Sequence, residues 1–185
     1  MHIVLYQPEI PANTGNVVRL CAVTGCHLHL IRPLGFSTDD RQLKRAGLDY
    51  WHLLKIDYWD DIRELFEVYK DHPKYFLTSR AAKGYTDVHY GPDSLLIFGR
   101  ETSGLPDWIH EEFPEQCLRI PMIPDPKARC LNLSNAVAVV AYEAFRQQPD
   151  FGGLSLTPTF HSGKLNSQYE SRLSSGFQNL TFINR

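Results

Sequence analysis

Residues 120–145 join a short apolar stretch, a proline-rich loop and a helix that begins with polar side chains. The Ile-Pro-Met tripeptide at 120–122 offers an apolar wall and a backbone edge that suit a flat heteroaromatic base. Asn132, Ser134 and Asn135 can cap the following helix and can also hydrogen-bond a ligand. The Ala- and Val-rich body of that helix is typical of a buried core helix. This combination indicates a ligand-binding loop rather than a plain connection.

A second polar motif, FGRETSGL at residues 98–105, follows another apolar stretch. Gly99 closes a strand expected to be buried and permits a ligand to approach the backbone closely. Glu101 can accept hydrogen bonds from an amine or a hydroxyl group. The motif is not a G-x-G-x-x-G fingerprint, and no phosphate-loop lysine follows it. An ordinary strand-to-helix turn, which Gly and Ser often form, is the alternative.

The third motif is NTGNVVR at residues 13–19, in which Arg19 lies about one turn into an expected helix. Free N–H groups at the start of a helix and the guanidinium fork of arginine together suit a phosphate or another anion. A capped helix with a solvated arginine explains the same residues. The motif alone leaves both interpretations open.

The fragment Cys26-His27-Leu28-His29 contains three residue types that bind metals. It lacks a second ligand pair at a recognised spacing, and its alternation suits a strand, so we expect no metal. The other cysteines are Cys21, Cys117 and Cys130. Without a secretion signal, all four are expected to be reduced.

The composition of the 185-residue chain is that of a globular protein with one main domain: 43% hydrophobic residues, 22% charged residues and a net charge of −2. Such a charge creates no bulk positive field, so nucleic-acid binding would depend on local basic patches. We recognise no signal peptide and no apolar run of about 18–20 residues that would span a bilayer. We therefore expect a cytoplasmic protein.

Hydrophobic patterning predicts alternating strands and helices, and hence an α/β fold with a mostly parallel sheet flanked by helices. The expected strands are 2–6, 28–31, 75–78, 94–99 and 117–122, and the expected helices are 13–25 (starting at Asn13 or Thr14), 39–48, 60–70, 106–113 and 132–148. Ligands bind beyond the carboxyl ends of such strands, so the loops after the last three strands are candidates for one pocket. Residues 1–149 are expected to form the domain. Residues 150–185, rich in Ser, Gly and Asn, are expected to form a flexible tail.

The motifs N-x-G-N-x-x-R, F-G-x-E-x-x-G-L and I-P-M…L-N-L-S-N-A-V-A, in this order over residues 1–148, resemble the SPOUT (trefoil-knot) RNA 2′-O-methyltransferases. Residues 5–16 and 45–50 resemble most the small family members that methylate the wobble cytidine or uridine of tRNA. The resemblance implies a deep C-terminal trefoil knot near residues 120–135. It also implies a homodimer with the first and last helices at its interface. S-adenosylmethionine as cofactor and tRNA as substrate are implied in the same way.

The resemblance also assigns roles to individual residues. The implied cofactor-binding residues are Leu77, Thr78, Gly99, Glu101, Gly104, Ile120, Pro121, Met122, Cys130, Leu131 and Ser134. Arg19 is the expected catalytic residue. Because a guanidinium stays protonated in proteins, holding the target phosphate and polarising the ribose hydroxyl is a better role for it than general base. Asn135 and Tyr142 are expected to orient the ribose or phosphate, and the expected tRNA-backbone contacts are Arg41, Lys44, Arg45, Lys127 and Arg129.

Two other functions stay open at this point. One is 2′-O-methylation of ribosomal RNA, although the lack of a separate RNA-binding domain favours a compact substrate such as an anticodon loop. The other is a non-catalytic RNA-binding module of the same fold. The intact Gly99, Glu101 and 132–135 positions argue against that module, because a decayed cofactor site would not need them.

Overall fold

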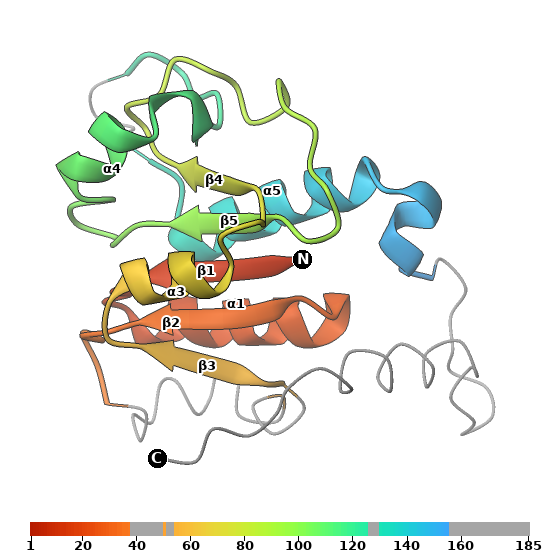
Figure 1. The fold of residues 1–185 in the computed structure, drawn as a ribbon, viewed down its shortest axis with the longest axis horizontal. Helices are drawn as coiled ribbons and strands as arrows, with labels where there is room; N and C mark the ends of the chain where they lie inside the picture. Colours follow the sequence, from red (N-terminus) through yellow and green to blue (C-terminus); the bar gives the residue numbers. More distant parts are fainter. Residues whose placement is uncertain (38–49, 51–53, 126–129, 156–185) are drawn as a thin grey trace. The chain divides into compact units, whose positions relative to one another are not determined.

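The computed structural model describes residues 1–37, 50, 54–125 and 130–155 (Figure 1). The chain divides into two compact units, Met1–Leu154 and Ser155–Arg185, and the account below concerns the first. The predicted helix 39–48 and all five predicted tRNA contacts, Arg41, Lys44, Arg45, Lys127 and Arg129, lie outside the described residues.

A six-stranded sheet forms the centre of the first unit, with the strand order β3-β2-β1-β5-β4-β6. Every pair of neighbouring strands is parallel, which confirms the predicted parallel α/β fold. The central strands are continuous apolar stretches because both faces of the sheet are covered. The strands are β1 (His2–Tyr6), β2 (His27–Ile31), β3 (Ile56–Trp59), β4 (Lys74–Leu77), β5 (Leu95–Phe98) and β6 (Cys117–Leu118).

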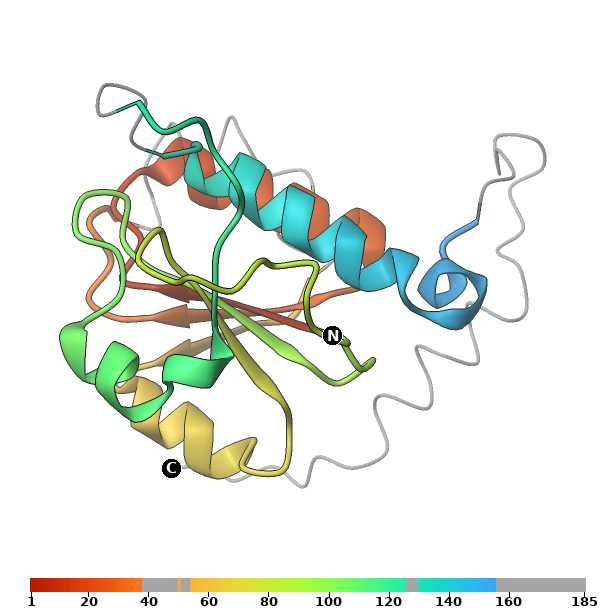
Figure 2. The ribbon, with the colours of Figure 1, turned by 90° about the horizontal axis from the view of Figure 1, so that it is seen from above.

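Helices cover both faces of the sheet, as Figure 2 shows. On one face lie α1 (Pro11–Thr24) and α5 (Leu133–Arg146), side by side and running in the same direction. On the other face lie α3 (Ile62–Val68) and α4 (Asp107–Glu112). Two separate hydrophobic cores fill the spaces between these layers. No helix among the described residues is long and apolar enough to cross a membrane.

Helix α1 begins earlier than the sequence predicts. Its first residue is Pro11, whose fixed φ suits the first helical position, and Ile10 is the N-cap without a side-chain bond. Asn13 and Thr14 are therefore buried inside the first turn and do not cap it. The predicted end is confirmed, because Gly25 adopts the left-handed conformation (φ 72°) that terminates many helices.

Two strands also differ from the prediction. β3 is not recognisable as an apolar stretch, because it lies at the edge of the sheet and all four of its residues are only half-buried. β6 is shorter than the predicted strand 117–122 and ends at Leu118. Pro121 has no N–H for a strand ladder, so residues 119–122 form part of a loop.

The compact unit continues a few residues beyond the predicted domain boundary at 149. A short 3₁₀ turn, Pro149–Gly153, packs against α5. The Phe151 ring lies 6.3 Å from that of Tyr142, and a Cβ on Gly152 would lie 2.6 Å from Cδ1 of Phe145. The rest of the predicted tail, residues 156–185, lies outside the description.

Candidate active site

The three predicted cofactor loops meet at one edge of the sheet. Strands β5, β4 and β6 are neighbours, and their carboxyl ends lead into Gly99, Thr78 and Arg119 respectively. The structure therefore brings the loops that contain Leu77, Thr78, Gly99, Glu101, Gly104 and 120–122 to the same side of the molecule. Parallel sheets bind their ligands at this edge.

Backbone hydrogen bonds hold the loop after β6 against the loop after β4. Thr78 N–H donates to the Leu118 carbonyl (2.9 Å), and Arg119 N–H donates to the Lys83 carbonyl (2.8 Å). The Arg119 carbonyl in turn accepts from Tyr85 N–H (2.9 Å). The chain thus enters the 120–122 loop from a fixed direction.

Residues 120–122 expose an unpaired backbone edge. Within the described part of the chain, no hydrogen bond is made by the backbone of Ile120 or Met122. The Ile120 side chain packs against the core beneath α1 and α5, so the apolar wall is anchored. A half-buried apolar surface beside free backbone donors and acceptors fits a purine, which has an apolar face and a polar edge.

Gly99 is small for a reason that the sequence did not suggest. A Cβ at this position would lie 2.2 Å from the Gly104 carbonyl carbon and 2.5 Å from the Leu105 nitrogen. Arg100 and Gly104 exchange two backbone hydrogen bonds of 3.0 Å, which close the loop tightly. Gly99 therefore makes room for its own chain, and the loop it permits presents Glu101.

The Glu101 carboxylate binds the start of α1. It accepts hydrogen bonds from the N–H groups of Glu9 (2.8 Å) and Ile10 (3.2 Å) and from the side-chain amide of Asn13 (2.9 Å). Glu9 returns the interaction, because its carboxylate accepts from the backbone N–H (3.0 Å) and hydroxyl (2.9 Å) of Thr102. A negative charge at a helix N-terminus is also favoured by the helix dipole. In this structure Glu101 positions α1, and both its oxygens are already in use.

Asn132 extends this interaction to α5. Its side-chain amide donates to Oδ1 of Asn13 (2.8 Å), and its own Oδ1 accepts from the backbone N–H (2.9 Å) and hydroxyl (2.7 Å) of Ser134. Asn132 is thus the N-cap of α5, as its residue type predicts. The series Glu101–Asn13–Asn132–Ser134, called the polar bridge below, joins the three sequence motifs. Its members are too far apart in sequence for spacing to reveal it.

The predicted catalytic residues lie on the outer surfaces of α1 and α5. Arg19 is exposed, with its guanidinium carbon 5.0 Å from the ring centroid of Tyr50, and it has no ion pair within the described residues. Asn135 is exposed near the start of α5. Tyr142 lies eight residues beyond Ser134, about 12 Å along the helix axis, and the structure does not bring it to the polar bridge.

The last two predicted cofactor residues, Cys130 and Leu131, are exposed at the end of the 123–131 loop. This loop includes residues 126–129, which lie outside the description. Both residues immediately precede Asn132, so the polar bridge determines where this end of the loop lies.

Sequence reasoning missed a groove at the carboxyl ends of β2 and β3. Its lining is Arg32, Pro33, Leu34, Phe36, Ser37, Tyr58 and Asp60. Arg32 pairs with Asp60 (3.0 Å) and lies 5.3 Å from the centroid of the Tyr58 ring. The groove adjoins the loop after β1, because Gly35 N–H donates to the Pro8 carbonyl (2.9 Å). Arginine beside aromatic rings after a strand end was the available signal.

Comparison with known proteins gives the family. The model described as the SpoU rRNA Methylase family matches residues 1–142. The tRNA (cytidine(34)-2′-O)-methyltransferase of Escherichia coli (strain K12) is 49% identical over 148 residues, which are 80% of this chain and 93% of that protein. A relative from Listeria monocytogenes (serotype 4b, strain F2365), to which the same activity is provisionally assigned, is 53% identical over 162 residues, covering 86% and 94%.

A solved structure described as "Structural insights into the 2-OH methylation of C/U34 on tRNA" has a TM-score of 0.73 and 44% identity, covering 79% of this chain and 94% of that one. These likenesses extend over the sheet, the helices and all three motifs. They confirm the resemblance that the motifs indicated. The chain belongs to the SpoU rRNA Methylase family.

Proposed function

We propose that the protein transfers a methyl group from S-adenosylmethionine to the 2′-oxygen of the tRNA wobble nucleotide, a cytidine or uridine at position 34. The polar bridge is the observation that carries the proposal, because it holds the three family motifs in one arrangement. The relatives that act on this nucleotide span nearly their full lengths in the match, so the chain contains the corresponding domain.

We place the adenine of the cofactor against Ile120 and Met122, whose apolar side chains and open backbone edge fit a purine. When bound, S-adenosylmethionine supplies a methyl group on a sulfonium, which is a good leaving group. The loops after Thr78 and Gly99 border the same space and complete the pocket. Cys130, Leu131 and Ser134 close it from the side of α5.

Arg19 is the residue to which we assign the reacting hydroxyl. Its exposed guanidinium has no carboxylate partner in the described structure, so it is available for an RNA phosphate. From there its N–H groups polarise the 2′-hydroxyl and stabilise the negative charge that develops on oxygen during transfer. Asn135, exposed on the neighbouring helix, orients the ribose. Holding these groups in line contributes most of the rate enhancement for such a displacement.

The test is methyl incorporation into unmodified tRNA, with the modified nucleotide mapped by mass spectrometry. We expect one methyl group on the ribose at position 34. Transfer to ribosomal RNA with none to tRNA would instead favour the related ribosomal activity. If S-adenosylhomocysteine fails to bind in an equilibrium measurement, the chain is a non-catalytic RNA-binding module and the proposal is wrong.

The trefoil knot belongs to the same proposal. Arg119 is hydrogen-bonded on both sides to residues of the 78–90 loop, through Lys83 and Tyr85. A segment held inside a preceding loop is the arrangement that a knot requires. The tRNA contacts of Arg41, Lys44, Arg45, Lys127 and Arg129, the flexible tail and the cytoplasmic location stay predictions.

We further propose a homodimer through the outer faces of α1 and α5. Val139 and Tyr142 are 39% and 44% exposed at positions i and i+3, so they form one apolar stripe. Val23 on α1 is also exposed. In a dimer, Tyr142 of one subunit would then serve RNA binding at a composite surface.

Sedimentation of Val139→Asp tests the dimer. A buried charge at the interface should convert the dimer to monomers. Val68→Asp is the matched control, because Val68 is 64% exposed on α3, on the opposite face of the sheet. Equal sedimentation of wild type and both variants would contradict this interface.

A further inference from the structure

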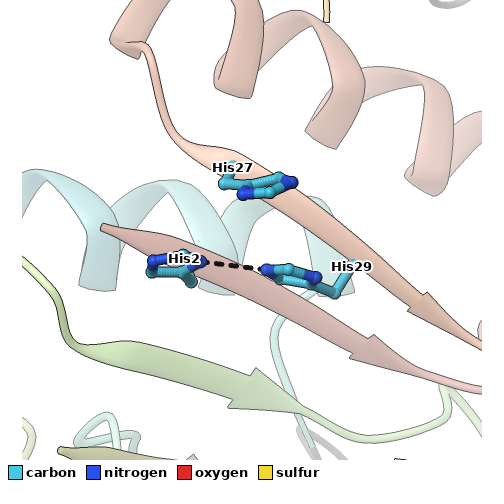
Figure 3. A group of neighbouring side chains, drawn as sticks. All are labelled: His2, His27 and His29. Carbon is cyan, nitrogen blue, oxygen red and sulfur yellow. Dashed lines mark hydrogen bonds between the residues drawn. The ribbon is translucent and has the colours of Figure 1, made fainter. Parts of the chain in front are cut away.

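Three histidines gather at the amino ends of β1 and β2, far from the candidate active site. Figure 3 shows His2, His27 and His29 with their rings over the same face of the sheet. One ring nitrogen from each lies within 4.8 Å of the others. β1 is five residues long, so about 13 Å of strand separates His2 from the carboxyl edge of the sheet.

Strand register explains why the sequence did not reveal this cluster. His2 is the parallel partner of His27, and His29 follows two residues later on the same face. The missing ligand of the Cys-His-Leu-His fragment thus comes from the neighbouring strand. Cys26 does not take part, because its side chain is buried in the core on the other side. The ligand set is three imidazoles.

Hydrogen bonds determine where the protons lie. Nδ1 of His29 accepts from the Trp59 indole N–H (3.2 Å), so the proton of His29 is on Nε2. That proton is donated to Nδ1 of His2, 2.9 Å away. Burial lowers the pKa of His2 to about 2 and that of His29 to about 3. Both rings are therefore neutral near pH 7, the state in which imidazole binds metals.

His27 and Asp57 complete the surroundings. Nε2 of His27 is buried without a well-aligned hydrogen bond, although Oδ2 of Asp57 lies 2.9 Å away. The same carboxylate oxygen is 3.9 Å from Nδ1 of His29. A carboxylate beside the ring nitrogens of metal-binding histidines is a common feature of metal sites. A buried nitrogen without a partner also requires an explanation, and a bound ion is one.

We propose that His2, His27 and His29 bind one divalent transition-metal ion, with Zn²⁺ as the ion that suits three neutral imidazoles and an open fourth position. Zn–N bonds of about 2.0–2.1 Å place tetrahedral nitrogens about 3.4 Å apart. The present limit of 4.8 Å is met by modest rotation of the rings. The ion replaces the proton now shared between Nδ1 of His2 and Nε2 of His29.

Metal binding has a local consequence at Trp59. When Nε2 of His29 binds the ion, the ring proton moves to Nδ1, which then no longer accepts the indole hydrogen bond. Asp57 is the nearest acceptor for that proton. Met1's amino group and Lys55 add positive charge nearby, and Asp57 offsets it. Trp59 fluorescence is consequently a reporter built into the site.

Calorimetric titration of the full, untagged chain with Zn²⁺, after treatment with a chelator, tests the proposal. We expect one Zn²⁺ per chain. His2→Gln and His27→Gln should abolish this binding, and Asp57→Asn should weaken it about 10- to 100-fold. His89→Gln is the matched control, because His89 is exposed and outside the cluster. Unchanged binding in His27→Gln, or loss of binding in Cys130→Ser, would overturn the assignment.

A second measurement guards against variants that merely misfold. Titration of the wild type with Co²⁺ should produce the visible absorption of a tetrahedral ion and a parallel change in Trp59 emission. His27→Gln should show neither change while its circular dichroism matches that of the metal-free wild type. Absence of both signals in the wild type would exclude the site.

Discussion

The two edges of the sheet differ in how their polar groups are satisfied. At the carboxyl edge, side chains hold the loops together, and the backbone of 120–122 is left open. At the amino edge, β1 and β2 are fully paired, and it is the imidazole side chains that lack complete partners. The first arrangement presents a backbone surface to an organic ligand. The second presents nitrogen lone pairs to an ion.

This contrast separates chemistry from support. If the carboxyl edge carries the reaction, changes there should impair methyl transfer with or without a loss of stability. Changes at the amino edge should affect stability or metal binding alone. Each prediction below tests one side of that division.

Arg19→Ala should have the largest effect on activity. Loss of one charge-stabilising donor typically costs about 100- to 1,000-fold in turnover, and we expect that fall in methyl transfer to tRNA. Because Arg19 is exposed, the unfolding free energy and the affinity for S-adenosylhomocysteine should stay unchanged.

Arg63→Ala is the matched control for Arg19→Ala. Arg63 is also exposed and also lies over an aromatic ring, with 4.0 Å from its guanidinium carbon to the centroid of Trp108, but on the opposite face of the sheet. Equal activity in the two variants would remove Arg19 from the mechanism.

Glu101→Gln should reduce both stability and activity. An amide keeps one acceptor oxygen but turns its NH₂ group toward an N–H donor at Glu9, Ile10 or Asn13. We expect a loss of about 1–3 kcal/mol in urea unfolding, since a buried donor is left without a partner. Glu111→Gln, at an exposed position on α4, should have no effect.

The same variant distinguishes two roles for Glu101. A positioning residue should lower stability and methyl transfer together, as the polar bridge implies. A residue that only contacts the cofactor would weaken binding of S-adenosylhomocysteine and leave the unfolding free energy unchanged. The second result would restore the interpretation that the sequence first suggested.

The sequence predicted the elements whose pattern is local. β1, β2, β4 and β5 are short apolar stretches, and Asn132 and Gly25 mark helix ends by residue type. Prediction failed where a distant partner decides the structure. α1 starts at Pro11 because Glu101, some ninety residues away, takes the N–H groups at its start.

The same limit applies to both candidate sites. Family motifs indicated the loops of the carboxyl edge, but not that Gly99 accommodates its own chain or that Glu101 is occupied by α1. The histidine cluster depends on the parallel register of His2 and His27. That register follows from tertiary packing, and no spacing in the sequence contains it.

Asn132→Ala should have a smaller effect than Glu101→Gln. The change removes the N-cap of α5 and the bond to Asn13, with an expected cost of about 1 kcal/mol in unfolding. Asn132→Ser is the matched comparison, because serine also caps helices but is too short to bridge to Asn13. If Asn132→Ser restores stability but not methyl transfer, the bridge itself is needed for activity; full recovery of both would limit Asn132 to capping.

Trp59→Phe should have the smallest effect and tests the amino edge. The change keeps an aromatic ring but removes the indole N–H that His29, which is fully buried, accepts. Loss of one such bond predicts a decrease of roughly 0.5–1.5 kcal/mol in urea unfolding. Methyl transfer should match the wild type, because the bond lies at the opposite end of the strands from the candidate active site.

Trp108→Phe supplies the control for Trp59→Phe. Trp108 is also half-buried beside aromatic rings, but its indole N–H makes no hydrogen bond within the described residues, so only packing is lost. The difference in unfolding free energy between the two variants measures the bond to His29. If Trp59→Phe lowered methyl transfer as much as Glu101→Gln does, the two edges would be coupled through the strands, and the division between chemistry and support would fail.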